Sequence, residues 1–142
     1  MFYSTLVIAK ARSTPMNTFN ILLNECRDNI GKAYAPYSNH PVAAAAMTKN
    51  GNIFVGVNVE NIAFSGVCAE YGAISEWIKQ KNNVGEITNW VVINGNGNII
   101  TPCGRCRQHL LEHTPNAHVW QDNEWVSVKS LLPGAFVNIE KS

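Results

Sequence analysis

Apolar residues recur at helical spacing close to the N-terminal end of the chain. One face of a helix over about residues 15 to 33 collects five of them: Phe19, Leu22, Leu23, Cys26 and Ile30. Pro15 suits the first turn of this helix, and Thr14 precedes it as a candidate N-cap. Because Cys26 falls on the apolar face, we expect it to be a buried structural thiol.

After residue 41 the pattern changes to that of two paired strands. The dipeptide Asn50-Gly51 is a strong short-range signal for a β-hairpin. Behind it the segment "IFVGVNVE" (53–60) alternates, so that Phe54, Asn58 and Glu60 share one face. The segment "VAAAAMT" before the turn is rich in alanine, and its place opposite this strand predicts a strand whose small side chains let a helix pack closely.

The rest of the chain alternates between helical and strand patterns. We predict helices over residues 69–81 and 103–113, strands over 90–93 and 117–121, and a last short helix near 127–132. The resulting order, α-β-β-α-β-α-β, predicts an α/β fold with three layers, α/β/α, in which helices cover both faces of one mixed sheet. A length of 142 residues suits a single domain, 1–142.

Composition and charge favour a small-molecule ligand. The net charge is +1 and no run of lysine or arginine is present, so we expect no nucleic-acid partner. In "MFYSTLVIAK" the charges follow the apolar residues, opposite to the order in a signal peptide, and no segment is long enough to span a bilayer. We therefore expect a cytoplasmic protein without a membrane partner, in which cysteines are thiols or metal ligands.

The stretch "PCGRCRQ" (102–108) contains a Cys103-x-x-Cys106 pair that opens a predicted helix. Alone, such a pair is half of a structural zinc site, a redox pair or chance. Cys68 and Glu70 open the preceding helix, and the positive end of a helix favours thiolate over thiol. Three cysteines leave one position of a zinc ion for water, the arrangement of catalytic sites. With a nearby unbound glutamate, this is the pattern of the zinc nucleobase deaminases.

These residues stand in motifs that resemble the cytidine deaminase family in five places along the chain. "AYAPYS" (33–38) is similar to the segment before the family's first strand, and "NGNIFVGVNVEN" (50–61) to its hairpin. "VCAE" (67–70) and "PCGRCRQ" are similar to its zinc segments, and "LLPGAF" (131–136) to its C-terminal motif. The resemblance implies a mixed sheet of the five-stranded type.

The resemblance also implies an activity, the hydrolytic deamination of cytidine and 2′-deoxycytidine to uridine and 2′-deoxyuridine plus ammonia, in pyrimidine salvage. Cys68, Cys103 and Cys106 would bind Zn²⁺, and no organic cofactor would be needed. Hydroxide on the zinc would attack C4 of the base. Glu70 would move the proton of the water to N3 and then to the leaving amine.

Further residues take substrate roles by the same resemblance. Asn58 and Glu60 would hold the ribose hydroxyls, and backbone groups near Ala69 would orient the amino group. Phe136 would reach the pocket of a neighbouring subunit, because family members with three cysteines are typically homotetramers.

The chain departs from the family pattern at two positions of the site. Tyr71 stands where the family commonly has an arginine beside the cysteine sulfurs, and we hypothesise that Arg105 supplies that charge instead. His40 stands where the family often has a phenylalanine on the base, and either contacts the ligand or is structural. The lack of arginine after "CAE" also resembles blasticidin S deaminase, so deamination of such a nucleoside antibiotic is the alternative activity.

Three other readings of the cysteines stay open. A zinc-stabilised structural module would need a fourth protein ligand, for which His109 or His113 is a candidate. A thiol redox protein would use Cys103 and Cys106 but leaves Cys68 without a role. A nucleic-acid deaminase has the same chemistry, yet most carry histidine as the first ligand.

Overall fold

A computed structural model of the chain describes residues 14–137, so the predictions for residues 1–13, including the charge order at the N-terminus, lie outside the described residues. Five strands form one sheet in the order β2-β1-β3-β4-β5. Their bounds are β1 Val42–Thr48, β2 Ile53–Val57, β3 Ile87–Asn94, β4 His118–Gln121 and β5 Glu124–Ser127. Among these five strands of the described chain, β3 and β4 pair in parallel and the other neighbours pair antiparallel, which confirms the predicted mixed sheet.

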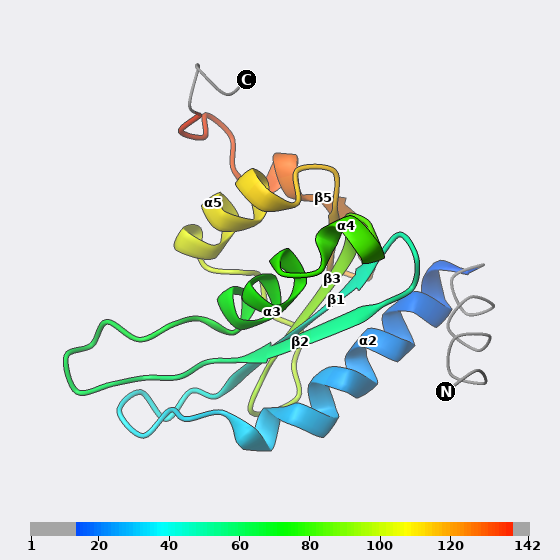
Figure 1. Cartoon of the computed structure of the whole chain (residues 1–142). Helices are drawn as coiled ribbons and strands as arrows, with labels where there is room; N and C mark the ends of the chain where they lie inside the picture. The colour runs from blue at the N-terminus through cyan, green and yellow to red at the C-terminus, as the bar shows by residue number, and fades with distance from the viewer. Residues whose placement is uncertain (1–13, 138–142) are drawn as a thin grey trace.

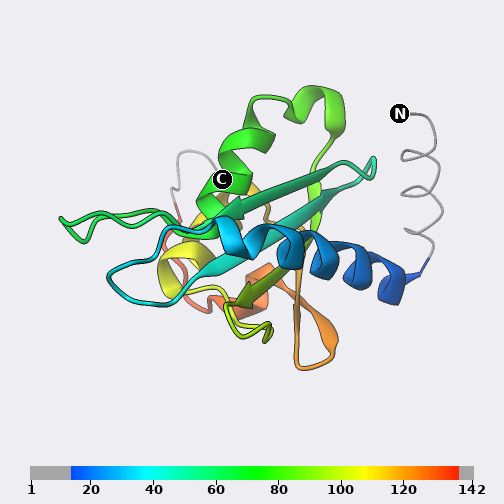
Figure 2. The same ribbon diagram turned by 90° about the horizontal axis from the view of Figure 1, so that it is seen from below.

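Helices cover both faces of the sheet and confirm the three layers. Helix α2 (Pro15–Asn29) lies on one face, and α3 (Ala69–Ile78) and α5 (Gly104–His113) lie on the other (Figure 1; Figure 2 shows the same layers from below). The Thr14 hydroxyl accepts a hydrogen bond from the Asn17 backbone N–H at 3.2 Å, as its N-cap position predicted. Helix α2 ends at Asn29 and continues as the 3₁₀ turn η1 (Ile30–Lys32), short of the predicted end.

The alanine-rich strand β1 lies between two layers of helices. Ala44 and Ala46 belong to the apolar cluster under α3, whereas Ala43 and Ala45 belong to the cluster under α2. All four are fully buried, which confirms that small side chains here permit close packing. Cys26, on the α2 side, is buried as predicted and its thiol donates to the Val91 carbonyl at 3.3 Å.

A fifth strand, β5, precedes the short helix that was predicted near 127–132. Strand β5 pairs antiparallel with β4 through a turn in which Asp122 and Asn123 both have positive φ, 51° and 64°. Trp120 and Trp125 face each other across this pair, with ring centroids 5.1 Å apart. The sequence did not predict β5, because its turn and its cross-strand contact with β4 are not revealed by periodicity. The short helix predicted near 127–132 is present as the 3₁₀ helix η2 (Val128–Leu131).

The short helix α4 (Lys81–Val84) connects α3 to β3. Among residues 14–137, no helix combines the length and apolarity that crossing a bilayer requires.

Candidate active site

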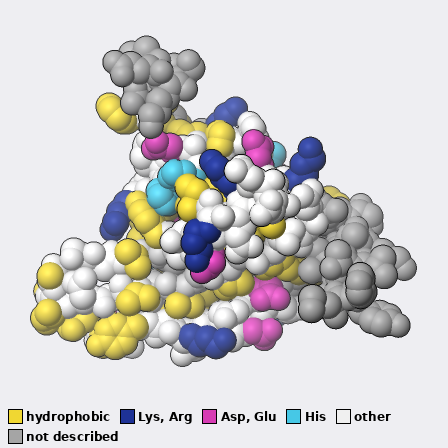
Figure 3. All heavy atoms as spheres, in the orientation of Figure 1, with side chains coloured by type: hydrophobic (Ala, Val, Ile, Leu, Met, Phe, Trp, Pro, Cys, Tyr) yellow, Lys and Arg dark blue, Asp and Glu magenta, His cyan; other side chains and the backbone are white. Residues whose placement is uncertain are grey.

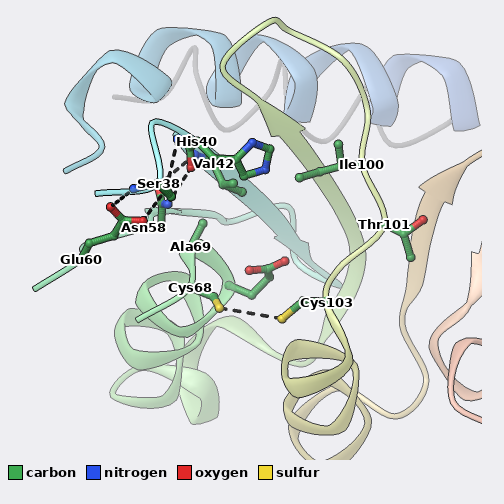
Figure 4. A pocket seen from close by; sticks show the side chains of 11 residues that line it. Ser38, His40, Val42, Asn58, Glu60, Cys68, Ala69, Ile100, Thr101 and Cys103 are labelled. Carbon is green, nitrogen blue, oxygen red and sulfur yellow. Dashed lines mark hydrogen bonds between the residues drawn. The ribbon is translucent and has the colours of Figure 1, made fainter. Parts of the chain in front are cut away.

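Three cysteine sulfurs meet where α3 and α5 begin. Cys68 is the N-cap of α3, Cys103 is the N-cap of α5, and Cys106 lies in the first turn of α5. The three sulfurs lie within 4.8 Å of one another, and the Sγ atoms of Cys68 and Cys103, which face each other in Figure 4, are 3.9 Å apart. From the sequence we expected these two segments to meet, because in each of them a cysteine stands at the start of a helix. The structure brings them together.

The chemistry of this cluster fits zinc. A tetrahedral Zn–S bond of about 2.3 Å separates two ligand sulfurs by about 3.8 Å, close to the distance found here. Burial raises the pKa of the thiols of Cys68 and Cys106 above the ordinary value, so both need a bound cation to be thiolates at neutral pH. Neither His109 nor His113 is a member of the cluster within the described chain, so the cluster supplies three ligand atoms.

Glu70 places a carboxyl group directly beside the cluster. Its side chain is only 3% exposed, and the Cys106 thiol donates a hydrogen bond to Oε2 at 3.2 Å. Burial raises the pKa of Glu70 above its ordinary value. A carboxyl group shifted in this direction is able to take up and release a proton nearer to neutral pH, as a general acid and base must.

A cavity of about 360 Å³ opens onto Glu70, Cys68 and Cys103. Its walls come from the loop before β1, the chain after β2, the start of α3 and the segment before α5 (Figure 4). The lining includes four further residues that the sequence predicted for the site: His40, Asn58, Glu60 and Ala69. Ser38, Ile100 and Thr101 also line it and were missed by the sequence reasoning.

Asn58 and Glu60 lie beyond the end of β2, which stops at Val57, and not within a strand as predicted. The Asn58 side chain accepts from the Val42 N–H at 2.9 Å and donates to the His40 carbonyl at 3.0 Å. It therefore fixes the backbone on both sides of residue 41, which carries the His40 ring to the cavity wall.

Glu60 accepts three hydrogen bonds from the neighbouring loop. The Ser38 hydroxyl donates at 2.5 Å, and the backbone N–H groups of Tyr37 and Ser38 donate at 3.0 and 3.2 Å. These bonds, that of the hydroxyl first, lower the pKa of Glu60 and keep it ionised. The only sequence signal for Ser38 was its place in "AYAPYS", a motif without an assigned contact.

Arg105 and Phe136 lie outside the cavity. Among its contacts in the described chain, Arg105 donates to the Tyr71 hydroxyl at 3.2 Å and to the Gly66 carbonyl at 3.3 Å. Its predicted charge role beside the sulfurs stays a prediction. Phe136 is 82% exposed, and its carbonyl accepts a hydrogen bond from the Gln108 side chain at 2.9 Å.

Comparison with known proteins identifies the family to which this arrangement belongs. The pattern of the cytidine and deoxycytidylate deaminase zinc-binding region matches residues 16–121, which include the three cysteines and Glu70. The chain belongs to the cytidine and deoxycytidylate deaminase family. The predicted resemblance, the enzyme class of zinc-dependent hydrolases and the zinc requirement are thereby confirmed.

Individual members of this deaminase family are similar over most of the chain. A cytidine deaminase of Mycobacterium tuberculosis is 35% identical over 96 residues, 67% of this chain and 71% of the relative. One of Sporosarcina psychrophila is 34% identical over 122 residues, 81% and 88% of the two chains.

Solved structures of the deaminase family confirm the fold. The crystal structure of cytidine deaminase from Mycobacterium tuberculosis matches with a TM-score of 0.78 at 32% identity, over 84% of this chain and 98% of that one. Cytidine deaminase from Burkholderia pseudomallei matches with a TM-score of 0.72 at 35% identity, over 82% and 98%.

Proposed function

We propose that this chain, as one domain, hydrolyses cytidine and 2′-deoxycytidine to uridine and 2′-deoxyuridine and releases ammonia. The observation that carries the proposal is the buried Glu70 carboxyl, hydrogen-bonded to one cysteine of a three-sulfur cluster and open to a cavity. Relatives named cytidine deaminase, at about a third identity, support the substrate.

Cys68, Cys103 and Cys106 would hold zinc, whose chemistry when bound is to acidify a water molecule. Glu70 would accept a proton from the attacking water at its carboxylate and deliver it to N3 of the base. The bond from C4 to the water oxygen forms. Glu70 would then take the remaining proton from the new C4 hydroxyl and pass it to the amino nitrogen, which leaves as ammonia when its bond to C4 breaks and the C4 carbonyl forms. Ala69, which lines the cavity beside Glu70, would orient the amino group through its backbone.

Asn58 and Glu60 retain hydrogen-bonding capacity for the ribose. A carboxylate has about four acceptor positions and an amide NH₂ has two donors. Glu60 uses three acceptor positions and Asn58 one donor among residues 14–137. We propose that the remaining acceptor position of Glu60 and the remaining donor of Asn58 bind the ribose hydroxyls. His40 would contact the base from the cavity wall.

The cavity favours a nucleoside over a nucleotide. Two carboxylates, Glu60 and Glu70, line it, and no lysine or arginine of the described chain does. A phosphate group is normally held by arginine or lysine, so deoxycytidylate would lack a partner here. Blasticidin S as the main substrate is not favoured, because the matched relatives are named cytidine deaminases.

Exposed apolar side chains support association of copies of this chain, and we propose a homotetramer because the family resemblance implies one. Ile62 and Phe64 are 71% and 79% exposed in the loop that projects from the molecule in Figure 1, where Figure 3 shows hydrophobic side chains gathered. Phe136 is similarly exposed. Burying such side chains between subunits would remove them from water. Sedimentation equilibrium tests this: a mass near the 15.6 kDa of one chain would contradict it.

We also propose a place in pyrimidine salvage in the cytoplasm. The proposal is supported by the three cysteines of the site, none of which forms a disulfide, as is usual for proteins of a reducing compartment.

The deciding experiment measures zinc content and ammonia release from cytidine, 2′-deoxycytidine, deoxycytidylate and blasticidin S. Glu70→Gln should retain zinc and lose turnover by at least about 100-fold, the usual contribution of a general acid or base. Glu76→Gln, on the exposed part of the same helix, is the matched control and should keep both. Turnover of blasticidin S alone, or full activity of Glu70→Gln, would overturn the proposal.

A further inference from the structure

One arginine side chain connects the two segments that carry the cysteine cluster. Arg105, on α5 between Cys103 and Cys106, donates from Nε to the Tyr71 hydroxyl at 3.2 Å. It also donates from a terminal guanidinium nitrogen to the Gly66 carbonyl at 3.3 Å. Gly66 and Tyr71 flank Cys68 in the sequence. A single side chain of α5 therefore binds the chain on both sides of the cysteine that caps α3.

Tyr71 is itself held by α5. Its ring lies face to face with the ring of His109, with centroids 3.8 Å apart and planes 3° from parallel. His109 follows Arg105 by one helical turn, so both side chains leave the same face of α5. The guanidinium carbon lies 4.7 Å from the centroid of the Tyr71 ring. The planar, forked guanidinium suits this combination of ring contact and two hydrogen bonds in a way that an ammonium group does not.

We propose that Tyr71 and Arg105 form a clamp that fixes the start of α3 against the start of α5, with Tyr71 as a positioning residue of the zinc site. None of the contacts of the clamp involves a cysteine sulfur, so the clamp would hold the two ligand-bearing segments together independently of the metal. Such preorganisation raises affinity because less ordering remains to be done on binding. The inference rests on the proposed zinc-dependent function and adds a residue to it.

The clamp differs from a purely electrostatic role of Arg105. Three thiolates and Zn²⁺ carry a net charge of −1, which any nearby cation would balance. Arg105 is exposed, however, and solvent and salt weaken the effect of an exposed charge. Its hydrogen bonds go to Tyr71 and Gly66, both neutral groups. The geometry thus favours a role that depends on the shape of the guanidinium as well as on its charge.

The test is the zinc affinity of the full-length chain, measured by competition with a chromophoric chelator. Tyr71→Phe removes the hydroxyl and keeps the ring on His109, and Arg105→Lys keeps the charge and removes the fork. Each should weaken zinc binding roughly tenfold, the lower end of the effect of residues that orient metal ligands. The double variant should lose little more than either single one, because both break the same contact. Lys79→Gln, which removes a remote exposed charge, should bind as the wild type does.

Two results would overturn the clamp. The first is that Tyr71→Phe and Arg105→Lys both bind zinc within twofold of the wild-type affinity. In that case, the zinc affinity of Arg105→Gln would show whether the positive charge alone matters. The second is an additive loss of zinc affinity in the double variant. If Arg105→Lys does not fold, Tyr71→Phe decides alone, since it removes one oxygen atom. A wild-type chain that binds no zinc would remove the proposed function and the clamp together, whereas wild-type binding with unaffected variants removes only the clamp.

Discussion

The substitution Gly56→Ala tests how the sheet positions the start of α3, and with it Cys68 and Glu70. Gly56 lies on β2 where the backbone of α3 crosses it. A Cβ at this position would overlap the Ala69 carbonyl oxygen and lie 2.7 Å from the Ala73 nitrogen, whereas real Cβ contacts stay above 3.0 Å. Both opposing atoms are backbone, so no side chain is able to move aside.

Relief of this overlap requires α3 to move away from the sheet by on the order of 1 Å, and such overpacking typically costs about 1–3 kcal/mol. With an m-value of about 2 kcal/mol/M in urea, a loss of about 2 kcal/mol lowers the unfolding midpoint by about 1 M. Because Cys68 caps the helix that moves, its sulfur also moves relative to those of Cys103 and Cys106. We therefore expect weaker zinc binding in addition to lower stability.

Urea unfolding of the metal-free protein measures the first effect, and chelator competition measures the second. Gly104→Ala is the matched control, because a Cβ there meets no atom within 4 Å and the residue lies in the first turn of α5. It should be neutral or stabilise by about 0.4–1 kcal/mol through a less flexible unfolded chain. A Gly56→Ala protein as stable as the control, with unchanged zinc affinity, would refute the reasoning.

Three further predictions concern other parts of the chain. Ser38→Ala should raise the pKa of Glu60 toward its ordinary value, because the hydroxyl that lowers it is removed. The variant should therefore be less stable than the wild type at neutral pH, and the difference should shrink as pH falls from the ordinary glutamate range through the lowered pKa, where Glu60 becomes protonated. Urea unfolding of both proteins from about pH 7 to about pH 3 measures this difference. A loss that does not change with pH would contradict this. Burial raises the pKa of Cys26 to about 12, so alkylation of the folded, zinc-free protein followed by mass spectrometry should label the exposed Cys103 well before Cys26, and equal rates at these two residues would be inconsistent with that burial. Asn123→Val should destabilise by about 1–2 kcal/mol because φ is 64° there, while Asn123→Gly should be tolerated; thermal unfolding that ranks them in the opposite order would argue against the β4–β5 turn.

Local patterns in the sequence were sufficient for much of the fold. The apolar face of α2, the cap at Thr14 and the Asn50-Gly51 hairpin each depend on residues within one or two turns of chain, so the periodicity predicts them directly. The alanines of β1 were predicted to lie under a helix because small side chains opposite a strong strand have few other uses. In the site, the Cys-x-Glu and Pro-Cys-x-x-Cys motifs occurring together made the candidate zinc ligands and the candidate acid/base recognisable. These residues are Cys68, Cys103 and Cys106 for the zinc and Glu70 for the proton transfer.

Other features depend on contacts between residues far apart in the sequence. Ser38 reaches Glu60 over 22 residues and Arg105 reaches Tyr71 over 34, and neither contact has a local pattern that predicts it. Strand β5 forms because it pairs with β4. Strand β2 ends at Val57 because its pairing with β1 ends there. Periodicity reports which face of an element is buried, but not which element covers it or at what register. The sequence by itself therefore determined most of the elements and the reactive side chains, whereas strand β5 and the distances and hydrogen-bond partners of the site were determined by the packing of α3, α5 and the loop before β1 against one sheet.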